Sequence, residues 1–344
     1  MARIVYSVSS IGLGHASRAV AIAEELTRLG HEVTFLTSGL AANFLESYGF
    51  NVSRIVRHPV PWVLAGRMVF PTLWYTRYWL NYKISKKVVN DFFMMFKPDV
   101  VVCDEEFASL VAAKENGLKT IVITDEFQLG FTKNRISSSL EKKIQNWFLS
   151  VLNEADMVIV PDDGISTKKV FYVGKVVRKV SQTREQIRLK YRLPLNSKLI
   201  LFSMTGSQLG RFLLEKTVLA LKKINHVDTC LAVSGNSSKL GGEGISELGF
   251  VRDNHELIFA SDLVVTTAGK STIDEALAFG TPIIAIPIGK HYEQEKNAAE
   301  LGFSYNDINR LDKLIVEKIA KRKNPVRAEG AFTAASLIER LASL

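Results

Sequence analysis

The sequence has very little cysteine: Cys103 and Cys230 are the only two among 344 residues. They lie far apart in apolar, strand-like runs, which excludes a disulfide framework and metal-ligand spacing and indicates buried thiols in a reducing compartment. A clean apolar run of about 18 residues is also lacking, so no membrane-spanning helix is expected. No signal-peptide pattern, low-complexity tract or solenoid-length repeat is found. These absences favour a globular protein of the cytoplasm.

Negative charge is the other scarce component. The chain has 35 Asp and Glu against 44 Lys and Arg, a formal net charge of +9 and a pI near 9.4. This balance favours anionic partners: phosphate groups, a membrane surface or nucleic acid. Nucleic acid is not expected as a partner, because the basic residues do not gather in a recognisable reading motif.

Short runs rich in Val and Ile alternate with amphipathic stretches, a pattern typical of parallel sheets with helical crossovers. The expected strands are 3–8, 32–37, 99–104, 119–124 and 156–161, then 199–204, 229–234, 262–267 and 282–287. The sequence therefore predicts an α/β protein with two doubly wound, Rossmann-like domains. We place the first domain at 1–160, a basic linker at 161–197, the second domain at 198–325, and a C-terminal helix at 326–344 that could pack on the first domain.

Residues 58–96 depart from this pattern. The segment is rich in aromatic residues with basic residues interleaved, and holds Trp62, Trp74, Trp79, Tyr75, Tyr78, Tyr82, Arg67, Arg77, Lys83, Lys86 and Lys87. It is either a core helix with aromatic packing or a patch for a membrane surface, since Trp and Tyr suit headgroup depth and basic residues attract anionic lipid. The two interpretations can apply to different faces of one helix.

A glycine-punctuated loop, SSIGLGH at residues 9–15, follows the first expected strand. Gly12 and Gly14 allow a ligand to approach the backbone, and the helix N-terminus beyond them favours phosphate. The G-x-G-H spacing differs from the dinucleotide fingerprint G-x-G-x-x-G. His15 either fills the loop and caps the helix or acts as a base near neutral pH, and we favour the base.

Two loops of small residues precede helices in the second half. Their residues are Gly206, Ser207, Gln208, Ala268, Gly269, Lys270, Ser271 and Thr272. Each loop follows an expected strand, so each helix N-terminus could receive a diphosphate, and Lys270 could add a direct phosphate contact. Glu275, one turn inside the later helix, either accepts hydrogen bonds from ribose hydroxyls or complements the helix dipole.

The order of these elements resembles the two-domain glycosyltransferases of the GT-B fold. It is most similar to the family 28-like branch that includes the lipid II N-acetylglucosaminyltransferase and the dolichol-linked chitobiose synthase, in an archaeal-type form. The resemblance covers nearly the whole chain and rests on five elements in one order. These are the loop ending at His15, GKVVR ending at Arg178, TGSQLG, AGKSTIDE ending at Glu275, and YEQEKNA with Glu293, Gln294 and Asn297.

The resemblance implies two domains facing a cleft and inverting transfer of a sugar from a nucleotide sugar, above all UDP-N-acetylglucosamine. The implied acceptor is a sugar linked to polyprenyl or dolichyl phosphate or pyrophosphate, with the enzyme peripheral on the inner face of the cell membrane. The implied donor-binding residues are Gly12, Gly14, Arg178, Gly206, Ser207, Gln208, Phe250, Val251, Ala268, Gly269, Lys270, Ser271, Thr272, Glu275, Glu293, Gln294 and Asn297.

The chemistry assigned to these residues needs one base. An acceptor hydroxyl loses a proton as it attacks the anomeric carbon, and His15 is the candidate general base. The resemblance implies that an acid at the end of a first-domain strand orients this histidine. Asp104, in VVCDEEF, either has that role or is a buried capping acid, and Glu105 beside it is a further catalytic candidate. Helix N-termini and Arg178 can stabilise the leaving diphosphate. No D-x-D-like pair is seen, so neither a metal nor a cofactor besides the nucleotide sugar is expected.

Two other enzyme classes stay open. A UDP-sugar epimerase or hydrolase can use the same fold, although such an enzyme gives no reason for the aromatic and basic segment 58–96. A glycosyltransferase with a soluble acceptor is the other. A third hypothesis, a nucleic-acid-binding protein without enzymatic activity, is supported only by the net charge.

Overall fold

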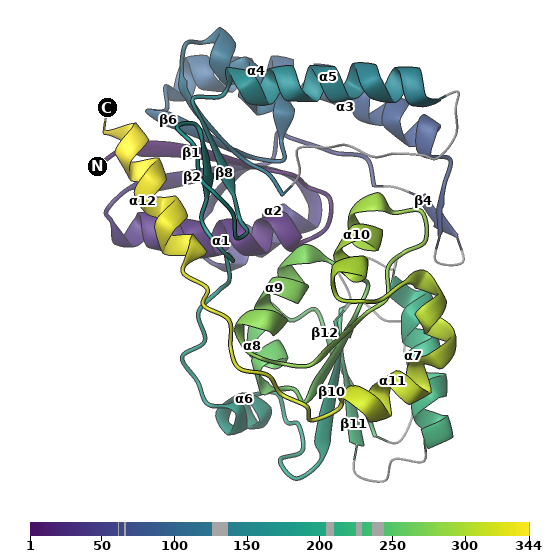
Figure 1. Cartoon of the computed structure of the whole chain (residues 1–344). Helices are drawn as coiled ribbons and strands as arrows, with labels where there is room; N and C mark the ends of the chain where they lie inside the picture. Colours follow the sequence, from purple (N-terminus) through teal and green to yellow (C-terminus); the bar gives the residue numbers. More distant parts are fainter. Residues whose placement is uncertain are drawn as a thin grey trace. The chain divides into compact units, whose positions relative to one another are not determined.

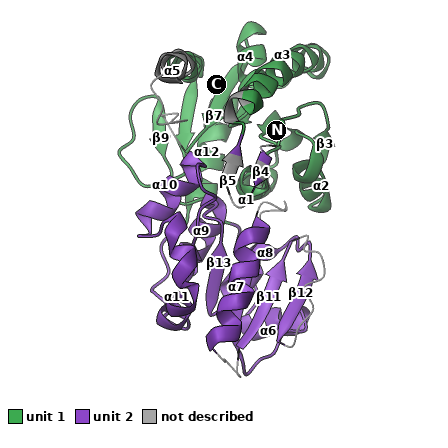
Figure 2. Cartoon of the chain, turned by 90° about the vertical axis from the view of Figure 1, so that its right-hand side faces the viewer, with its two compact units in different colours: residues 1–61, 70–177, 328–344 green, residues 62–69, 178–327 purple. Residues whose placement is uncertain are grey.

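The computed structural model describes residues 1–60, 62–64, 67–125, 137–203, 210–224, 229–235 and 244–343. The chain divides into two compact units (Figures 1 and 2). Unit 1 comprises residues 1–61, 70–177 and 328–344, and unit 2 comprises residues 62–69 and 178–327. Each unit has its own parallel sheet, which confirms the expected doubly wound α/β class.

Unit 1 is built on a seven-stranded sheet in the order β3-β2-β1-β6-β7-β8-β9. Every described pairing in it is parallel. Its strands are β1 (Arg3–Val8), β2 (Glu32–Leu36), β3 (Asn51–Ser53), β6 (Val100–Asp104), β7 (Lys119–Ile123), β8 (Met157–Val160) and β9 (Val170–Tyr172). The central strands are almost wholly buried on both faces, as their unbroken apolar runs predict.

Helices cover both faces of this sheet (Figure 1). One core contains residues of α1 (Gly14–Arg28), α2 (Gly39–Ser47) and the C-terminal helix α12 (Gly330–Ala342), together with Ile4 and Tyr6 of β1. The other contains residues of α3 (Pro71–Phe96), α4 (Phe107–Glu115) and α5 (Ser137–Glu154), together with Val5 of β1. The alternation of β1 side chains between these cores places the sheet between two helical layers.

The segment 58–96 contains a pair of antiparallel strands, β4 (Trp62–Leu64) and β5 (Arg67–Val69), and the long helix α3. Helix α3 has two different faces. Ser85, Val89 and Phe93 are buried, whereas the outer side exposes Leu73, Leu80, Ile84 and Val88. Core packing therefore accounts for one face of α3 and leaves an apolar face uncovered within the described chain.

Unit 2 has a five-stranded parallel sheet in the order β12-β11-β10-β13-β14. Its strands are β10 (Lys198–Ser203), β11 (Thr229–Ser234), β12 (Ile245–Gly249), β13 (Leu263–Thr266) and β14 (Ile283–Ala285). Its helices are α6 (Arg184–Lys190), α7 (Arg211–Ile224), α8 (Asn254–Ala260), α9 (Lys270–Ala278), α10 (Tyr292–Glu300), the 3₁₀ helix η2 (Tyr305–Arg310) and α11 (Leu311–Lys318).

All nine strands expected from the sequence are present, each within two residues of its expected ends. Besides β4 and β5, the two parallel sheets contain three strands that were not expected, β3, β9 and β12. Each lies at the edge of a sheet and is only partly buried, so its sequence lacks the apolar run that marks a central strand.

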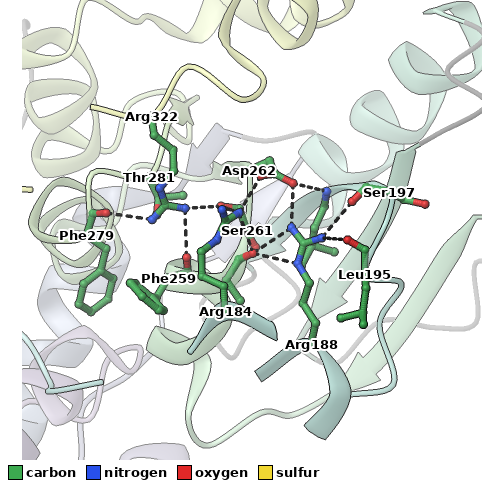
Figure 3. Close-up of polar contacts among 12 residues, drawn as sticks. Arg184, Arg188, Leu195, Ser197, Phe259, Ser261, Asp262, Phe279, Thr281 and Arg322 are labelled. Carbon is green, nitrogen blue, oxygen red and sulfur yellow. Dashed lines mark hydrogen bonds and ion pairs between the residues drawn. The ribbon is translucent and has the colours of Figure 1, made fainter. Parts of the chain in front are cut away.

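The basic stretch 161–197, expected as a linker, contains β9 of the first sheet and α6 of the second unit. Two of its arginines are structural (Figure 3). The Nη2 atoms of Arg184 and Arg188 lie 2.7 and 2.8 Å from the two carboxylate oxygens of Asp262. Arg322 donates to the carbonyl oxygens of Ser261 and Phe279. These arginines join α6, α8 and the returning C-terminal segment to the start of β13.

The C-terminal segment returns to unit 1 through a tight backbone crossing at Gly330. Its amide donates to the Lys175 carbonyl oxygen at 3.1 Å. A Cβ atom on Gly330 would lie 2.5 Å from the Gly174 carbonyl oxygen and 2.6 Å from that of Lys175. Since backbone atoms cannot move aside as a flexible side chain can, only glycine fits there.

We therefore expect Gly330→Ala to reduce the free energy of unfolding by about 1–3 kcal/mol, the usual cost of overpacking. Urea denaturation followed by circular dichroism measures this change. Ser336→Ala, at a partly exposed position of the same helix, is the matched control and should change stability by less than about 0.5 kcal/mol. Equal stabilities of the Gly330 and Ser336 variants would contradict the close crossing.

Candidate active site

The first group of candidate residues lies where β1 and β6 end. The two strands are neighbours, with Val8 paired to Asp104, and the loop after β1 leads into α1, of which His15 is the second residue. Carboxyl ends of parallel strands share one edge of a sheet, so His15 and Asp104 meet although they are 89 residues apart. His15 Nδ1 lies 2.9 Å from Asp104 Oδ1.

The Asp104 carboxylate fixes the orientation of the His15 imidazole. Nδ1–H donates to Asp104, whose side chain is fully buried, while the His15 side chain is 17% exposed. Nε2 lies on the opposite side of the ring, 3.6 Å from Glu105 Oε2. The structure thus brings the three candidate catalytic residues together, with Nε2 turned away from the buried acid.

Three consecutive acids at this edge have three different environments. Asp104 ends β6 and pairs with His15. Glu105 adopts a left-handed backbone conformation, φ +49°, which costs about 1–3 kcal/mol for a residue with a side chain. Glu106 caps α4, and its carboxylate accepts hydrogen bonds from the amides of Ala108 and Ser109. The strained turn at Glu105 separates its side chain from those of its neighbours.

Arg18 is a site residue that the sequence analysis missed. It lies one turn after His15 on α1 and is buried. Its Nε is 2.8 Å and its Nη2 2.5 Å from the Asp104 carboxylate, and its Nη1 is 2.5 Å from Asp125 Oδ2. The spacing of three residues in GHASR, which places His15 and Arg18 on one helix face, is the signal that could have found it.

The charges around His15 change its protonation. Burial alone would lower the pKa of His15, but the Glu105 carboxylate and the hydrogen bond to Asp104 outweigh it and raise the pKa to about 9. Burial would raise the pKa of Asp104, and Arg18 outweighs that effect and holds the pKa below its ordinary value. A pKa of about 9 makes His15 an imidazolium at neutral pH in this arrangement, whereas the expected role as a base requires a neutral imidazole.

We expect the His15 imidazole to titrate at about pH 9 and Glu105→Gln to lower that pKa, because the variant loses the carboxylate that contributes most to raising it. NMR of ¹⁵N-labelled histidine side chains measures both values. Since the folded-state pKa is raised, the stability contributed by His15 is complete below its ordinary pKa and is lost as pH rises through about 9.

Glu115→Gln is the matched control, because Glu115 is an exposed acid at the end of α4 that pairs with Lys86. It should leave the His15 titration unchanged. A His15 pKa near 6.5 in the wild-type protein, or one unaffected by Glu105→Gln, would contradict the ion pair.

The second group of candidate residues lies in unit 2 and centres on a buried ion pair. Arg178 Nε and Nη2 lie 3.1 and 3.0 Å from Glu275 Oε1, and both side chains are buried. Arg178 Nη1 also donates to the Arg252 carbonyl oxygen. His255 is nearby: burial and the Arg178 charge lower its pKa to about 3, so it stays neutral. The structure brings together Arg178 and Glu275, which come from separate motifs.

Other candidates shape the loops after β13 and β14. Ala268 has a left-handed conformation, φ +61°, just before α9, whose N-cap is Gly269. Asn297 Nδ2 donates to the Ala268 carbonyl oxygen, and Gln294 Oε1 accepts from the amide of Ile288. Lys270 Nζ lies 3.1 Å from Asp274 Oδ1. The phosphate contact expected of Lys270 therefore competes with an ion pair within α9.

The remaining candidates have simpler positions. Gly12 has φ +72° in the loop after β1, and Gly14 begins α1. Phe250 is exposed and Val251 buried just after β12. Ser271 and Thr272 lie in the first turn of α9, and Glu293 in that of α10. Gly206, Ser207 and Gln208 lie outside the described residues.

The described part of the chain contains neither a metal-binding cluster nor a membrane-spanning helix. No group of three or more His, Cys, Asp or Glu side chains there is arranged to hold a metal ion. Among the helices of the same residues, none is both long and apolar enough to cross a membrane.

Two doubly wound units, each with candidate residues at the carboxyl ends of its strands, are typical of nucleotide-sugar enzymes of the GT-B fold. A family model described as "Glycosyl transferase family 1" matches residues 2–322. The chain belongs to this family.

The comparisons with individual proteins agree. The chain is 30% identical, over 86% of its length and 82% of the relative's, to an uncharacterized glycosyltransferase of Methanosarcina acetivorans. It is 25% identical, over 80% of its length and 76% of the relative's, to the UDP-N-acetylglucosamine–N-acetylmuramyl-(pentapeptide) pyrophosphoryl-undecaprenol N-acetylglucosamine transferase of Geobacillus thermodenitrificans.

Two solved structures show the same fold. MurG of Acinetobacter baumannii matches with a TM-score of 0.62 and 16% identity, covering 99% of this chain and 100% of that one. A putative UDP-N-acetylglucosamine 2-epimerase of Listeria monocytogenes matches with a TM-score of 0.58 and 15% identity, covering 96% and 94%. The GT-B fold is therefore established, and the chain is a glycosyltransferase by family.

Proposed function

We propose that this protein is an inverting glycosyltransferase that moves N-acetylglucosamine from UDP-N-acetylglucosamine to a sugar carried on a polyprenyl or dolichyl phosphate or pyrophosphate. The observation that carries the proposal is the His15 imidazole, which is held by buried Asp104 through Nδ1 and presents Nε2 at the carboxyl end of the first sheet. The similarity to a named N-acetylglucosamine transferase supports the choice of donor.

In this proposal His15 Nε2 takes the proton of the acceptor hydroxyl. The acceptor oxygen bonds to the anomeric carbon while the bond from that carbon to the diphosphate oxygen breaks, which inverts the configuration. An imidazolium cannot accept a proton, so the working enzyme must have neutral His15. An acceptor hydroxyl that replaces Glu105 at Nε2 removes the contact that contributes most to raising the His15 pKa.

The leaving UDP carries negative charge that protein groups must stabilise. The N-terminus of α9, behind Gly269, supplies free amides and a positive dipole. Arg178 adds a buried positive charge, and Glu275, which holds Arg178, would accept hydrogen bonds from the ribose hydroxyls. Gly206, Ser207 and Gln208 complete the proposed diphosphate site. We propose that these groups replace a metal ion and that no further cofactor is required.

The proposed acceptor side is the outer surface of α3 in unit 1. Leu73, Leu80, Ile84 and Val88 form an exposed stripe at helical spacing. Lys83 and Lys87 are exposed on the same helix, and the Lys83 ammonium lies 5.7 Å from the Trp79 ring centroid. Apolar, aromatic and basic side chains together suit the headgroup region of an anionic bilayer. We propose peripheral binding to the inner face of the cell membrane there.

Incubation with radiolabelled UDP-N-acetylglucosamine and a lipid extract tests this function. Label in the organic phase, with mass analysis of the product, is the expected result. Label released as a changed free sugar would instead favour an epimerase, the alternative supported by the fold match to a putative 2-epimerase. Transfer only to water-soluble molecules would identify a glycosyltransferase with a soluble acceptor.

His15→Ala should lower kcat for transfer by roughly a hundredfold to ten-thousandfold, the usual contribution of a general base. The affinity for UDP, measured by calorimetry, should stay within a factor of about two, because the proposed donor residues other than Gly12 and Gly14 belong to unit 2. His31→Ala is the control: His31 is another buried histidine, bound to the Ala2 amide through Nδ1. Near-normal turnover in the His15 variant would contradict the assignment of His15 as the general base.

Leu80→Glu combined with Ile84→Glu should release the protein from anionic liposomes, because two charges replace apolar side chains in the exposed stripe of α3. Co-sedimentation at moderate salt measures this. Leu219→Glu, at a comparably exposed leucine of α7 in unit 2, should bind as the wild type does. Unchanged sedimentation of the double variant would show that α3 does not contact the membrane.

A further inference from the structure

We infer that His58 is a positioning residue. It fixes the loop that carries His15 against two other parts of unit 1: helix α3 and the acidic turn, which is formed by residues 104–106. This inference rests on the proposed role of His15. His58 joins three segments of unit 1 that are separate in sequence: the loop after β1, the turn after β6 and helix α3.

The first contact fixes the loop after β1. The Ser10 amide donates to His58 Nδ1 at 3.2 Å, and Ser10 Oγ lies 3.1 Å from the same nitrogen. The His58 amide donates back to Ser10 Oγ at 2.9 Å. Since Nδ1 accepts from a backbone amide, the ring proton lies on Nε2. Ser10 is five residues before His15, so these bonds hold the start of its loop.

The second contact is with the acidic turn. His58 Nε2 lies 3.9 Å from Glu106 Oε1. The Glu106 carboxylate is itself fixed, because it accepts from the amides of Ala108 and Ser109 and from Ser7 Oγ. Glu106 follows Glu105 directly in the chain. His58 therefore lies between the loop before His15 and the turn that places Glu105 against His15 Nε2.

The third contact is with α3. The His58 ring packs against Tyr78, with centroids 5.4 Å apart, and Tyr78 packs against Trp74. Trp74 Nε1 donates to the carbonyl oxygen of Pro59, which follows His58. The helix that exposes the apolar stripe is thus connected through two aromatic rings to the loop of the candidate base.

His58 is a positioning residue and not a second base. Its side chain is only 6% exposed, and Nδ1 is occupied by the Ser10 amide. Burial lowers its pKa, as does the charge of His15, against an opposite effect of Glu106. A neutral, enclosed ring with both nitrogens facing protein groups fits support of other residues and not proton exchange with a substrate.

Two amide variants separate the two nitrogens. In His58→Asn the side-chain oxygen takes the place of Nδ1 and can accept from the Ser10 amide. In His58→Gln the amide nitrogen takes the place of Nε2 and leaves the Ser10 amide without that acceptor. His58→Ala removes both functions, and His31→Ala controls for the loss of a buried histidine elsewhere in unit 1.

The first measurement is the titration of His15 by NMR of ¹⁵N-labelled histidine, which needs no substrate. The protein has six histidines, and the spectrum of His15→Ala assigns the resonance. His15 should titrate at about pH 9 in the wild type and in His58→Asn. In His58→Ala and His58→Gln the pKa should fall toward the ordinary value of about 6.5, because a displaced loop separates His15 from Glu105.

The second measurement is steady-state kinetics of sugar transfer. His58→Ala and His58→Gln should lower kcat by about tenfold to a hundredfold without changing KM for the donor, and His58→Asn should restore most of the rate. An unchanged His15 titration in both His58→Ala and His58→Gln would overturn the inference. If the His15 titration changes in the His58 variants but the wild-type protein transfers no sugar, the inference on His58 holds and the proposed function is overturned.

Discussion

The buried carboxylate of Asp104 is the constraint on which the first unit depends. An ionised carboxylate with no exposed surface needs paired positive charge and hydrogen bonds, since an unpaired buried charge costs several kcal/mol. Arg18 provides two donors, His15 a third and the Tyr6 hydroxyl a weaker fourth. To satisfy one acid, the start of α1 must therefore lie against the end of β6. The orientation of the imidazole follows from a pairing that folding itself requires.

Both units use the same geometry for different tasks. In each, a parallel strand ends in a short loop and a helix begins there, so side chains from neighbouring strands meet beside free backbone amides. At the carboxyl end of its sheet, unit 1 has acidic side chains around a histidine. Unit 2 has the Arg178–Glu275 ion pair and the backbone amides at the start of α9. Gly12, Glu105 and Ala268, which all have positive φ angles, lie at these edges.

Apolar periodicity was enough to predict the central strands, because a strand buried on both faces must be apolar throughout. The edge strands β3, β9 and β12 could not be found this way, as each has partly exposed residues. The pairing of His15 with Asp104 was expected from the resemblance to related enzymes, in which an acid at the end of a first-domain strand orients the histidine. The roles of Arg18 and His58 depend on partners distant in sequence, and the left-handed turn at Glu105 has no local signature, so the raised His15 pKa was not foreseen.

The position of α12 has a consequence for how the chain is made. Its buried face, with Ala334, Ala335 and Ile338, completes the core around α1. During synthesis, the 150 residues from 178 to 327 emerge between the rest of unit 1 and this helix. At about 5–20 residues per second the α1 surface stays uncovered for roughly 8–30 s. Domains usually finish folding in the order in which they are synthesised. Here the unit that begins to leave the ribosome first is the last to complete its core.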